Sequence, residues 1–267
     1  MKPKRAFTLV ELLVVISIIA LLVTIIMPTL GRAKELAKRG ACAGNLNAVV
    51  KGLETYAAGW GGKFPTCEFD SPSRFDVVGD ALTSRKFGSN EASSNSRNLY
   101  LAIRTGDVDP EALVCPAVAT DKAASRGAGK YWDFNCGNGN DYVNRCSYSY
   151  HVQFRSGHPL TMASNSAMAV LADKSPFVKY PGSSVGSGCQ GNIGIGGGEA
   201  ASTNSPNHGG EGQNVAYPDG HVSYEENPCV GVDGDNIYTV WDGENHTGGT
   251  ISSGSVPQGL TDSFLGP

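Results

Sequence analysis

The sequence predicts an α+β fold in which one long N-terminal helix packs, through its second half, on a small antiparallel β-sheet head with long loops. Three observations support this prediction. An apolar run covers residues 7–27, an amphipathic helical pattern continues to about residue 60, and short strand-like runs between turn residues fill the rest. Glycine contributes 35 of the 267 residues and only 17% are charged, as expected for a loop-rich chain.

The apolar run begins directly after a basic leader, residues 1–6. From Phe7 to Met27 the only ionisable residue is Glu11. A helix of this length would measure roughly 32 Å, about the thickness of the hydrocarbon core of a bilayer. Positive residues keep their end of a membrane helix in the cytoplasm. The predicted topology is therefore a single span of the cytoplasmic membrane, with the chain after Met27 outside the cytoplasm.

Two simpler interpretations of the run fit less well. A secretory signal peptide has a shorter apolar region followed by a small-residue cleavage site, and IIMPTLGRAKELAKR contains no clear Ala-x-Ala site. A plain membrane anchor explains the length but not Glu11, because a carboxylate inside an apolar span costs several kcal/mol on insertion scales. A functional role for Glu11 is therefore favoured.

The segment AFTLVELLVVISIIALLV closely resembles the class III signal of type IV prepilins and type II secretion pseudopilins. The resemblance implies that a prepilin peptidase cleaves between Ala6 and Phe7 and that Phe7 is then N-methylated. It also makes Glu11 the fifth mature residue, a position where the family has glutamate. The chain departs from the family at Ala6, since the family usually has glycine before the cleavage site.

Cleavage would give a physical purpose to Glu11. The new amino group on Phe7 is positive, and in a filament of packed N-terminal helices it can pair with the Glu11 carboxylate of a neighbouring subunit. Such a pair offsets two burial penalties and fixes the axial register of the helices. Glu11 is therefore predicted to be an assembly group.

The second half of the long helix has a different pattern. Pro28 is predicted to kink the helix, because proline removes a hydrogen bond and clashes with the preceding turn. Apolar residues then recur every three or four positions, the spacing of one helix face, at Cys42, Leu46, Val49, Leu53 and Tyr56. The glycines of GWGGKFP would end the helix. The predicted organisation is leader 1–6, transmembrane and assembly helix 7–27, amphipathic helix 28–60 and globular α+β head 61–267.

The head is predicted to contain one short helix and several short strands. The helix would lie within SSNSRNLYLAIRTGD, and the strands within CSYSYHVQF, SAMAVLADKS, QNVAYPDGHVSYEE and DNIYTVWD. The third strand segment is a hairpin pattern, because apolar residues alternate on both sides of Pro218-Asp219-Gly220.

The same hairpin carries a second resemblance. NHGGEGQNVAYPDGHVSY is similar to the C-terminal processing-associated motif of large pseudopilin-like proteins, in which nine residues separate a histidine from Asp-Gly; here ten separate His208 from Asp219. Asp219 and Gly220 are predicted to form a tight turn, and no chemistry is predicted for His208. Shorter pieces also resemble that group: CAGNLNAVVKGLETYAAGWGGKFP, LVCPA, SYSY, LADKSP and NIYTVW.

Seven cysteines in a chain predicted to be exported suggest disulfide bonds, with at least one thiol left free or paired with another chain. Cys136 and Cys146 are candidates for a local disulfide loop, and Cys42 and Cys115 for a bond between helix and head. The connectivity stays open. Because the sequence contains no HExxH or CxxC spacing, no zinc site is predicted.

One acidic segment, DGDNIYTVWDGE, is a candidate calcium site with ligands Asp233, Asp235, Asp242 and Glu244. It is not an EF-hand, because Ile237 and Tyr238 replace a ligand and the required glycine. The resemblance to major pseudopilins of type II secretion, which carry calcium in a C-terminal loop, implies a Ca²⁺ ion here. The alternative is a solvated acidic loop. No other cofactor is predicted.

The composition also limits the function. The net charge is −4, and about −7 without the leader, which argues against broad nucleic-acid binding. No catalytic triad or cofactor fingerprint is present, so the chain is not predicted to be an enzyme. The prediction is a structural subunit that joins copies of itself or other pseudopilins, on an assembly platform, in a type II secretion pseudopilus or type IV pilus-like filament.

Two alternatives remain open at this point. The head could be a minor or tip binding module that engages cargo, DNA or a surface, delivered by the N-terminal helix. It could also be a membrane-anchored enzyme whose site is not evident in the sequence, in which case the head would contain a pocket with convergent polar groups.

Overall fold

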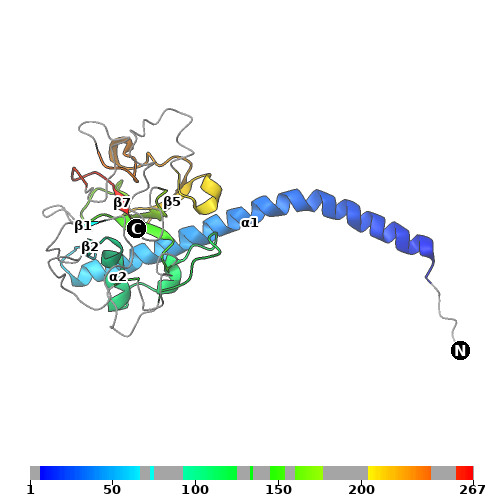
Figure 1. Cartoon of the computed structure of the whole chain (residues 1–267), viewed down its shortest axis with the longest axis horizontal. Coiled ribbons are helices and arrows are strands. Elements are labelled where there is room, and N and C mark those ends of the chain that lie inside the picture. The colour runs from blue at the N-terminus through cyan, green and yellow to red at the C-terminus, as the bar shows by residue number, and fades with distance from the viewer. Residues whose placement is uncertain are drawn as a thin grey trace.

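A computed structural model describes residues 7–66, 73–74, 93–124, 133–134, 145–153, 160–176, 204–241 and 257–266. Figure 1 shows a long helix whose N-terminal half projects from a head built around its C-terminal half. The head contains a five-stranded antiparallel sheet. The predicted α+β, pilin-like architecture is therefore confirmed.

Helix α1 spans Leu9–Gly59 without interruption. It begins with a capping box, in which the Thr8 hydroxyl accepts a hydrogen bond from the Glu11 N–H and the Glu11 carboxylate accepts one from the Thr8 N–H. Pro28 lies inside the helix and does not end it, and the projecting part is curved (Figure 1).

The two halves of α1 differ sharply in burial. The large apolar side chains of the projecting half are all exposed, from Phe7 to Leu30. The predicted apolar stripe is buried in the head, at Cys42, Leu46, Val49, Leu53 and Tyr56. Buried packing thus begins at Cys42, well after Pro28, because the intervening residues are polar or lie beyond the edge of the head.

The sheet has the strand order β6-β5-β4-β3-β7. The strands are β3 (Tyr148–His151), β4 (Leu171–Asp173), β5 (Gln213–Ala216), β6 (Val222–Glu225) and β7 (Leu265–Gly266). The first four lie in the segments predicted as strands, and β5 and β6 form the predicted hairpin. The two-residue strand β7 was not predicted, since so short a run has no visible alternation.

The predicted strand in DNIYTVWD is wrong. Asn236 starts a turn there: its side-chain oxygen accepts from the Tyr238 N–H (3.1 Å) and its carbonyl from the Thr239 N–H (3.0 Å). Ile237 and Tyr238 are nevertheless fully buried. The apolar run therefore reflects burial in a turn that makes a single β-bridge, from Asn236 to Cys229, because asparagine competes with further strand pairing for these donors.

The remaining elements are short. Helix α2 (Ser96–Thr105) confirms the predicted helix in the head, and η1 (Pro110–Leu113), η4 (Asn207–Gly210) and η5 (Val232–Gly234) are 3-10 turns. Strands β1 (Ser73–Arg74) and β2 (Ser93–Ser94) form a separate parallel pair.

Two hydrophobic clusters lie on opposite faces of the sheet. Along β4, Leu171 belongs to the cluster that includes α1 and α2, whereas Ala172 belongs to a second cluster with Ile237 and Phe264. Neighbouring residues on a strand point to opposite faces. The sheet is therefore covered by the helices on one face and by the C-terminal segments on the other.

Helix α1 approaches the backbone after α2 closely at Gly52. A Cβ atom there would lie 2.4 Å from the Asp107 carbonyl oxygen and 2.7 Å from Val108 Cγ2. We expect Gly52→Ala to lower the free energy of unfolding by about 1–3 kcal/mol, because the helix must move away from this backbone. Urea unfolding of the full chain in detergent measures the change.

Gly44 supplies the control on the same helix, because a Cβ there meets nothing within 4 Å. Gly44→Ala should leave the protein as stable or raise its stability by up to about 1 kcal/mol through helix propensity. Equal effects of the two substitutions would contradict the packing of α1 described here.

Burial of His151 should make the stability of the fold depend on pH. Its ring is 2% exposed, Nε2 lies 3.1 Å from the Asp262 carbonyl, and burial lowers its pKa to about 4 from 6.5. The unfolded chain therefore takes up a proton near pH 6.5 that the folded chain resists. Stability is fully present above about pH 6.5 and declines by up to about 3 kcal/mol as the pH falls to about 4.

Urea unfolding of wild type and His151→Gln at several pH values isolates this contribution, because the carboxylates titrate in both proteins. The difference in stability between the two should shrink on acidification. Parallel pH profiles would show that His151 titrates alike in both states.

Candidate functional site

The projecting half of α1 is the first functional feature. Within the described residues, α1 is the one helix long and apolar enough to cross a membrane. The head buries none of the most apolar stretch of this helix. Phe7, at its start, is 70% exposed. Burying one large apolar side chain is worth about 1.5–3 kcal/mol. A row of such side chains therefore requires lipid or other helices as cover.

Glu11 lies at the tip of this half. Its Oε2 accepts hydrogen bonds from the Thr8 N–H (2.9 Å) and the Thr8 hydroxyl (2.7 Å). A carboxylate is favourable in the first turn of a helix, where the N–H groups are unpaired. Glu11 is thus one turn from Phe7, and Ala6, on the other side of the predicted cleavage site, lies outside the described residues.

The second feature is the docking of the β5–β6 hairpin on α1. His208 Nδ1 lies 2.8 Å from Glu35 Oε1, and the Asn47 amide donates to the Gly220 carbonyl. These two contacts are roughly 18 Å apart along the helix axis, at ~1.5 Å per residue. The two ends of the His208 to Asp219-Gly220 segment therefore each contact α1 and fix the hairpin along it.

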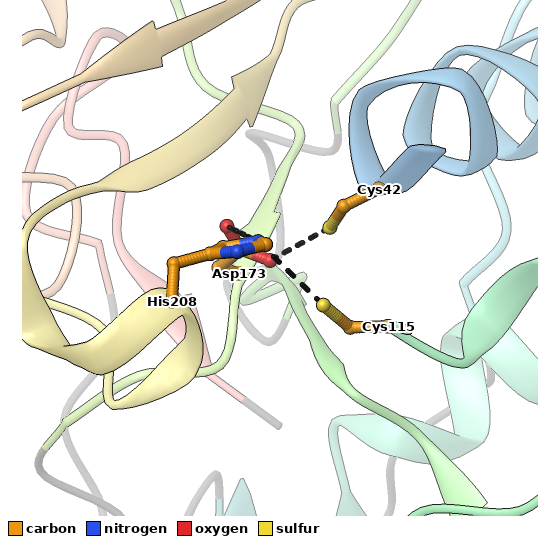
Figure 2. A group of neighbouring side chains, drawn as sticks. All are labelled: Cys42, Cys115, Asp173 and His208. Carbon is orange, nitrogen blue, oxygen red and sulfur yellow. Dashed lines mark hydrogen bonds and ion pairs between the residues drawn. The ribbon is translucent and has the colours of Figure 1, made fainter. Parts of the chain in front are cut away.

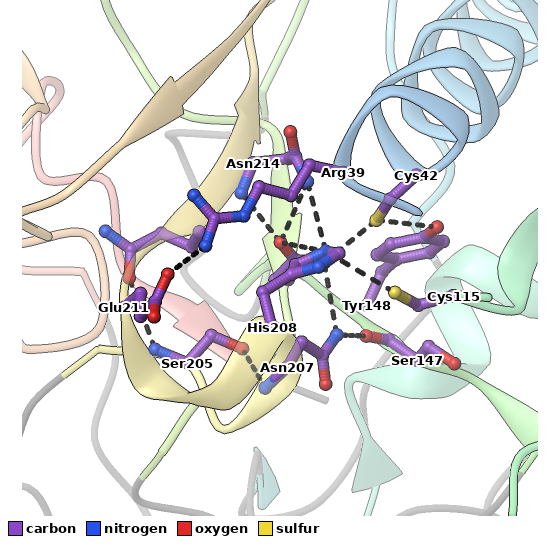
Figure 3. A network of polar contacts seen from close by, with 12 residues as sticks. Arg39, Cys42, Cys115, Ser147, Tyr148, Ser205, Asn207, His208, Glu211 and Asn214 are labelled. Carbon is purple, nitrogen blue, oxygen red and sulfur yellow. Dashed lines mark hydrogen bonds and ion pairs between the residues drawn. The ribbon is translucent and has the colours of Figure 1, made fainter. Parts of the chain in front are cut away.

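A cation reinforces this docking between the two ends. The Arg39 guanidinium lies 4.3 Å from the centre of the Tyr224 ring. It also forms an ion pair with Glu211, which Figure 3 shows. At the far end, Asp219 and Gly220 form a tight turn: Gly220 has φ +80°, its N–H donates to the Tyr217 carbonyl (3.0 Å), and the Asp219 carboxylate accepts from the His221 N–H (3.1 Å). The Asp219 side chain therefore stabilises the turn, whereas the His208 side chain lies inside the head.

His208 is part of a buried polar cluster with Cys42, Cys115 and Asp173 (Figure 2). These residues come from four separate segments: α1, the turn after η1, the end of β4, and η4. His208 Nε2 lies 3.6 Å from Cys115 Sγ and 3.6 Å from Asp173 Oδ2. Each residue offers one metal-ligating atom, and all four atoms lie within 4.8 Å of one another.

Asp173 is held in place by several donors. Its Oδ2 accepts from the Asn214 N–H (2.7 Å) and side chain (3.2 Å), and its Oδ1 accepts from the Asn207 amide (3.1 Å) and the Cys42 thiol (3.1 Å). Figure 3 shows these side chains surrounding the cluster. A buried carboxylate requires such partners, because its desolvation is costly.

The cluster shifts the pKa values of its members. The pKa of Cys115 falls to about 6, first through a hydrogen bond from the Cys42 thiol and then through His208. The pKa of Cys42 rises well above its ordinary value for the reciprocal reason and through burial. Burial lowers the pKa of His208, but Cys115, Asp173 and Glu35 outweigh it and raise the pKa to about 9.

The predicted disulfide partners fall into two groups. Cys42 and Cys115 are brought together, yet both are free thiols here. Cys146 is also a free, buried thiol, which donates to the Tyr148 carbonyl (3.2 Å), whereas Cys136 lies outside the described residues. Both pairings stay predictions.

The described members of the calcium set do not form a site by themselves. Asp233 is in an exposed turn, and both carboxylate oxygens of Asp235 accept protein donors, from Trp241 Nε1 (2.9 Å) and the Ser263 N–H (2.6 Å). Burial raises the pKa of Asp235 to about 7. Asp242 and Glu244 lie outside the described residues, so the calcium site stays a prediction.

The family comparison matches the N-terminal segment. The family described as the prokaryotic N-terminal methylation motif matches residues 1–27, which include the leader, Phe7 and Glu11. The N-terminal segment of the chain is that of a type IV prepilin-like protein. The match does not include the β5–β6 hairpin. The similarity of the His208 to Asp219-Gly220 segment to the C-terminal motif therefore stays a prediction. Neither curated proteins nor solved structures yield a match.

The sequence marks three of the four cluster residues as candidates, but it gives no sign that they meet. Cys42, Cys115 and His208 are far apart in the chain, and no short spacing marks them. Asp173 was not singled out at all, and neither was Glu35. Only the packing of four segments at one point reveals the group.

Substitution of Asn207 tests whether the hydrogen bonds around this cluster stabilise the head. Its side-chain amide donates to the Ser147 carbonyl (3.0 Å) and to Asp173 Oδ1. We expect Asn207→Ala to lower the free energy of unfolding by about 1–3 kcal/mol, because buried acceptors lose their donor. Asn207→Asp should be worse, since it places a second carboxylate beside Asp173. Urea unfolding in detergent measures both.

The control is Asn165→Ala. Asn165 is exposed and bonds only locally, to the Ala167 N–H, so its loss should change stability by no more than about 0.5 kcal/mol. If Asn207→Ala were equally mild, the hydrogen bonds to Asp173 would not contribute to holding the head together.

Proposed function

We propose that this prepilin-like protein is a structural subunit of a type II secretion pseudopilus or a type IV pilus-like filament. In this proposal the leader 1–6 is removed by a prepilin peptidase and Phe7 is N-methylated. Residues 7–27 anchor the chain in the cytoplasmic membrane and later form the filament core. Residues 28–60 connect this helix to the head, residues 61–267, which stays outside the cytoplasm.

The observation that carries the proposal is the combination of an unpartnered apolar helix half with a carboxylate at its tip. The exposed apolar side chains require a lipid or helical environment. In that environment Glu11 requires a positive partner, because an unpaired carboxylate in an apolar medium is costly. The new amino group of Phe7 on a neighbouring subunit is a partner that cleavage itself creates.

The head has features of a rigid attachment rather than of a catalyst. Prepilin-like proteins are structural, and the buried polar groups described here are engaged with each other and with backbone groups. The partners in this proposal are copies of the chain or related subunits, together with the assembly platform.

Substitution of Glu11 tests the proposal in cells that make the filament. Glu11→Gln keeps the size and the Thr8 contact but removes the charge. We expect normal membrane insertion and processing, but recovery in the sheared filament fraction reduced by at least about tenfold, because the amine of Phe7 loses its counter-charge. Quantitative immunoblotting of membrane and filament fractions gives the measurement.

The matched control is Glu226→Gln, an exposed carboxylate on the head that should not affect assembly. Wild-type levels of Glu11→Gln in filaments would rule out the pairing. If wild-type protein itself is found only in trace amounts among other subunits, the minor or tip role that engages cargo, DNA or a surface would replace the major-subunit role.

A further inference from the structure

We propose that Cys42, Cys115, Asp173 and His208 bind one zinc(II) ion, which joins helix α1 to the head. The site was not expected from the sequence, since no zinc spacing is present. It is independent of filament assembly, because it lies in the half of α1 that the head surrounds (Figures 1 and 2).

The spacing of the donor atoms fits a tetrahedral ion. With zinc bonds of about 2.3 Å to sulfur and about 2.0–2.2 Å to nitrogen and oxygen, neighbouring ligand atoms are about 3.4–3.8 Å apart. His208 Nε2 is 3.6 Å from both Cys115 Sγ and Asp173 Oδ2, and Cys42 Sγ is 3.1 Å from Asp173 Oδ1. Small side-chain movements would bring all four donors to bonding distance.

The histidine is oriented as a metal ligand. Its Nδ1 is 2.8 Å from Glu35 Oε1, so Nδ1–H donates to the carboxylate and Nε2 is the ring nitrogen that faces the cluster. Metal binding would release the Nε2 proton and use its lone pair. A carboxylate behind a ligating histidine is a regular feature of zinc sites, where it fixes the tautomer and the ring orientation. Glu35 is thus a positioning residue.

The backbone at His208 supports the same conclusion. His208 has φ 54° and ψ 29°, the left-handed conformation that non-glycine residues rarely adopt. It is followed by Gly209 and Gly210, which also have positive φ. Such local strain persists where the surrounding structure demands it, and here it directs the imidazole into the cluster.

The donor set selects the metal. Two sulfurs, one imidazole nitrogen and one carboxylate oxygen favour zinc over calcium or magnesium, which prefer oxygen donors alone. All four residues are buried, and four protein ligands leave no open position, which characterises a structural site rather than a catalytic one.

The surroundings balance the negative charge of the ligands. The Tyr148 hydroxyl lies 3.2 Å from Cys42 Sγ, and the amides of Asn207 and Asn214 donate to Asp173 (Figure 3). Each carboxylate oxygen has two acceptor positions. Once the Cys42 thiol has lost its proton, Oδ1 of Asp173 accepts only from the Asn207 amide and keeps one position for a metal ion.

Two other states of the cluster compete with a zinc site. A Cys42–Cys115 disulfide would use the sulfurs, at a bond length of about 2.05 Å, but would give no role to the convergence of Asp173 and His208. A metal-free hydrogen-bonded cluster would keep a carboxylate, an imidazolium and thiols buried without the ion that their atoms surround. The experiment distinguishes all three states.

The experiment measures zinc in the full chain, purified in detergent without chelator, by elemental analysis and native mass spectrometry. We expect about one zinc per chain, and at least about tenfold less in Cys115→Ser and Asp173→Asn. Glu35→Gln should retain the fold but bind zinc about 10–100-fold more weakly. Its control, Glu54→Gln on the same helix, should bind zinc as the wild type does.

A second measurement does not depend on whether the variants fold. Wild-type protein stripped with a chelator and refilled with Co²⁺ should show the visible bands of tetrahedral cobalt bound to thiolate. Less than about 0.1 zinc per chain after refilling with Zn²⁺ would overturn the proposal. Peptide mapping that finds a Cys42–Cys115 disulfide in protein from the native membrane would also overturn it.

Discussion

The head does not bury the apolar side chains in the first half of helix α1. The proposed function of the protein depends on this constraint. Apolar side chains that the head does not cover must enter a bilayer or contact other helices. Both environments exclude water, so the one carboxylate in that half, Glu11, requires a partner there. In the proposed function, the leader would orient the helix, cleavage would supply an amine, and the filament would supply the neighbouring subunit, so that each step would help to meet this requirement.

The second half of α1 has the opposite task, which is to hold the head firmly. Its apolar side chains from Cys42 to Ala57 are buried in the head. Apolar packing alone permits sliding along a helix, whereas polar contacts fix position: Glu35 with His208 at one end of the hairpin, and Asn47 with Gly220 at the other. Asp173 then connects the sheet to α1 through Cys42. A zinc ion in the same cluster would bind directly to α1, β4 and η4, so that force on the helix would reach the head through bonds.

Much of this fold is predictable from sequence because its signals are local. The 7–27 run, the helical stripe and the Pro218-Asp219-Gly220 hairpin each depend on residues close together in the chain, and the structure confirms the helix, its stripe and the hairpin. The same reasoning fails at Asn236, where an apolar run is buried in a turn and forms one isolated β-bridge instead of a strand. The sequence does not predict the cluster of Cys42, Cys115, Asp173 and His208 for another reason. Its members come from four separate segments, and no periodicity or spacing in the sequence indicates that they are close in space.

The most direct test of the assembly account is mass spectrometry of the N-terminal peptide from protein isolated in its native membrane or filament fraction. The account predicts a peptide that begins at N-methylated Phe7, because the amine created there is the partner that Glu11 requires. A chain that still begins at Met1 would contradict it and leave a plain membrane anchor. A chain that begins after Pro28 would contradict it as well, since the head would then be released without the helix on which the filament depends.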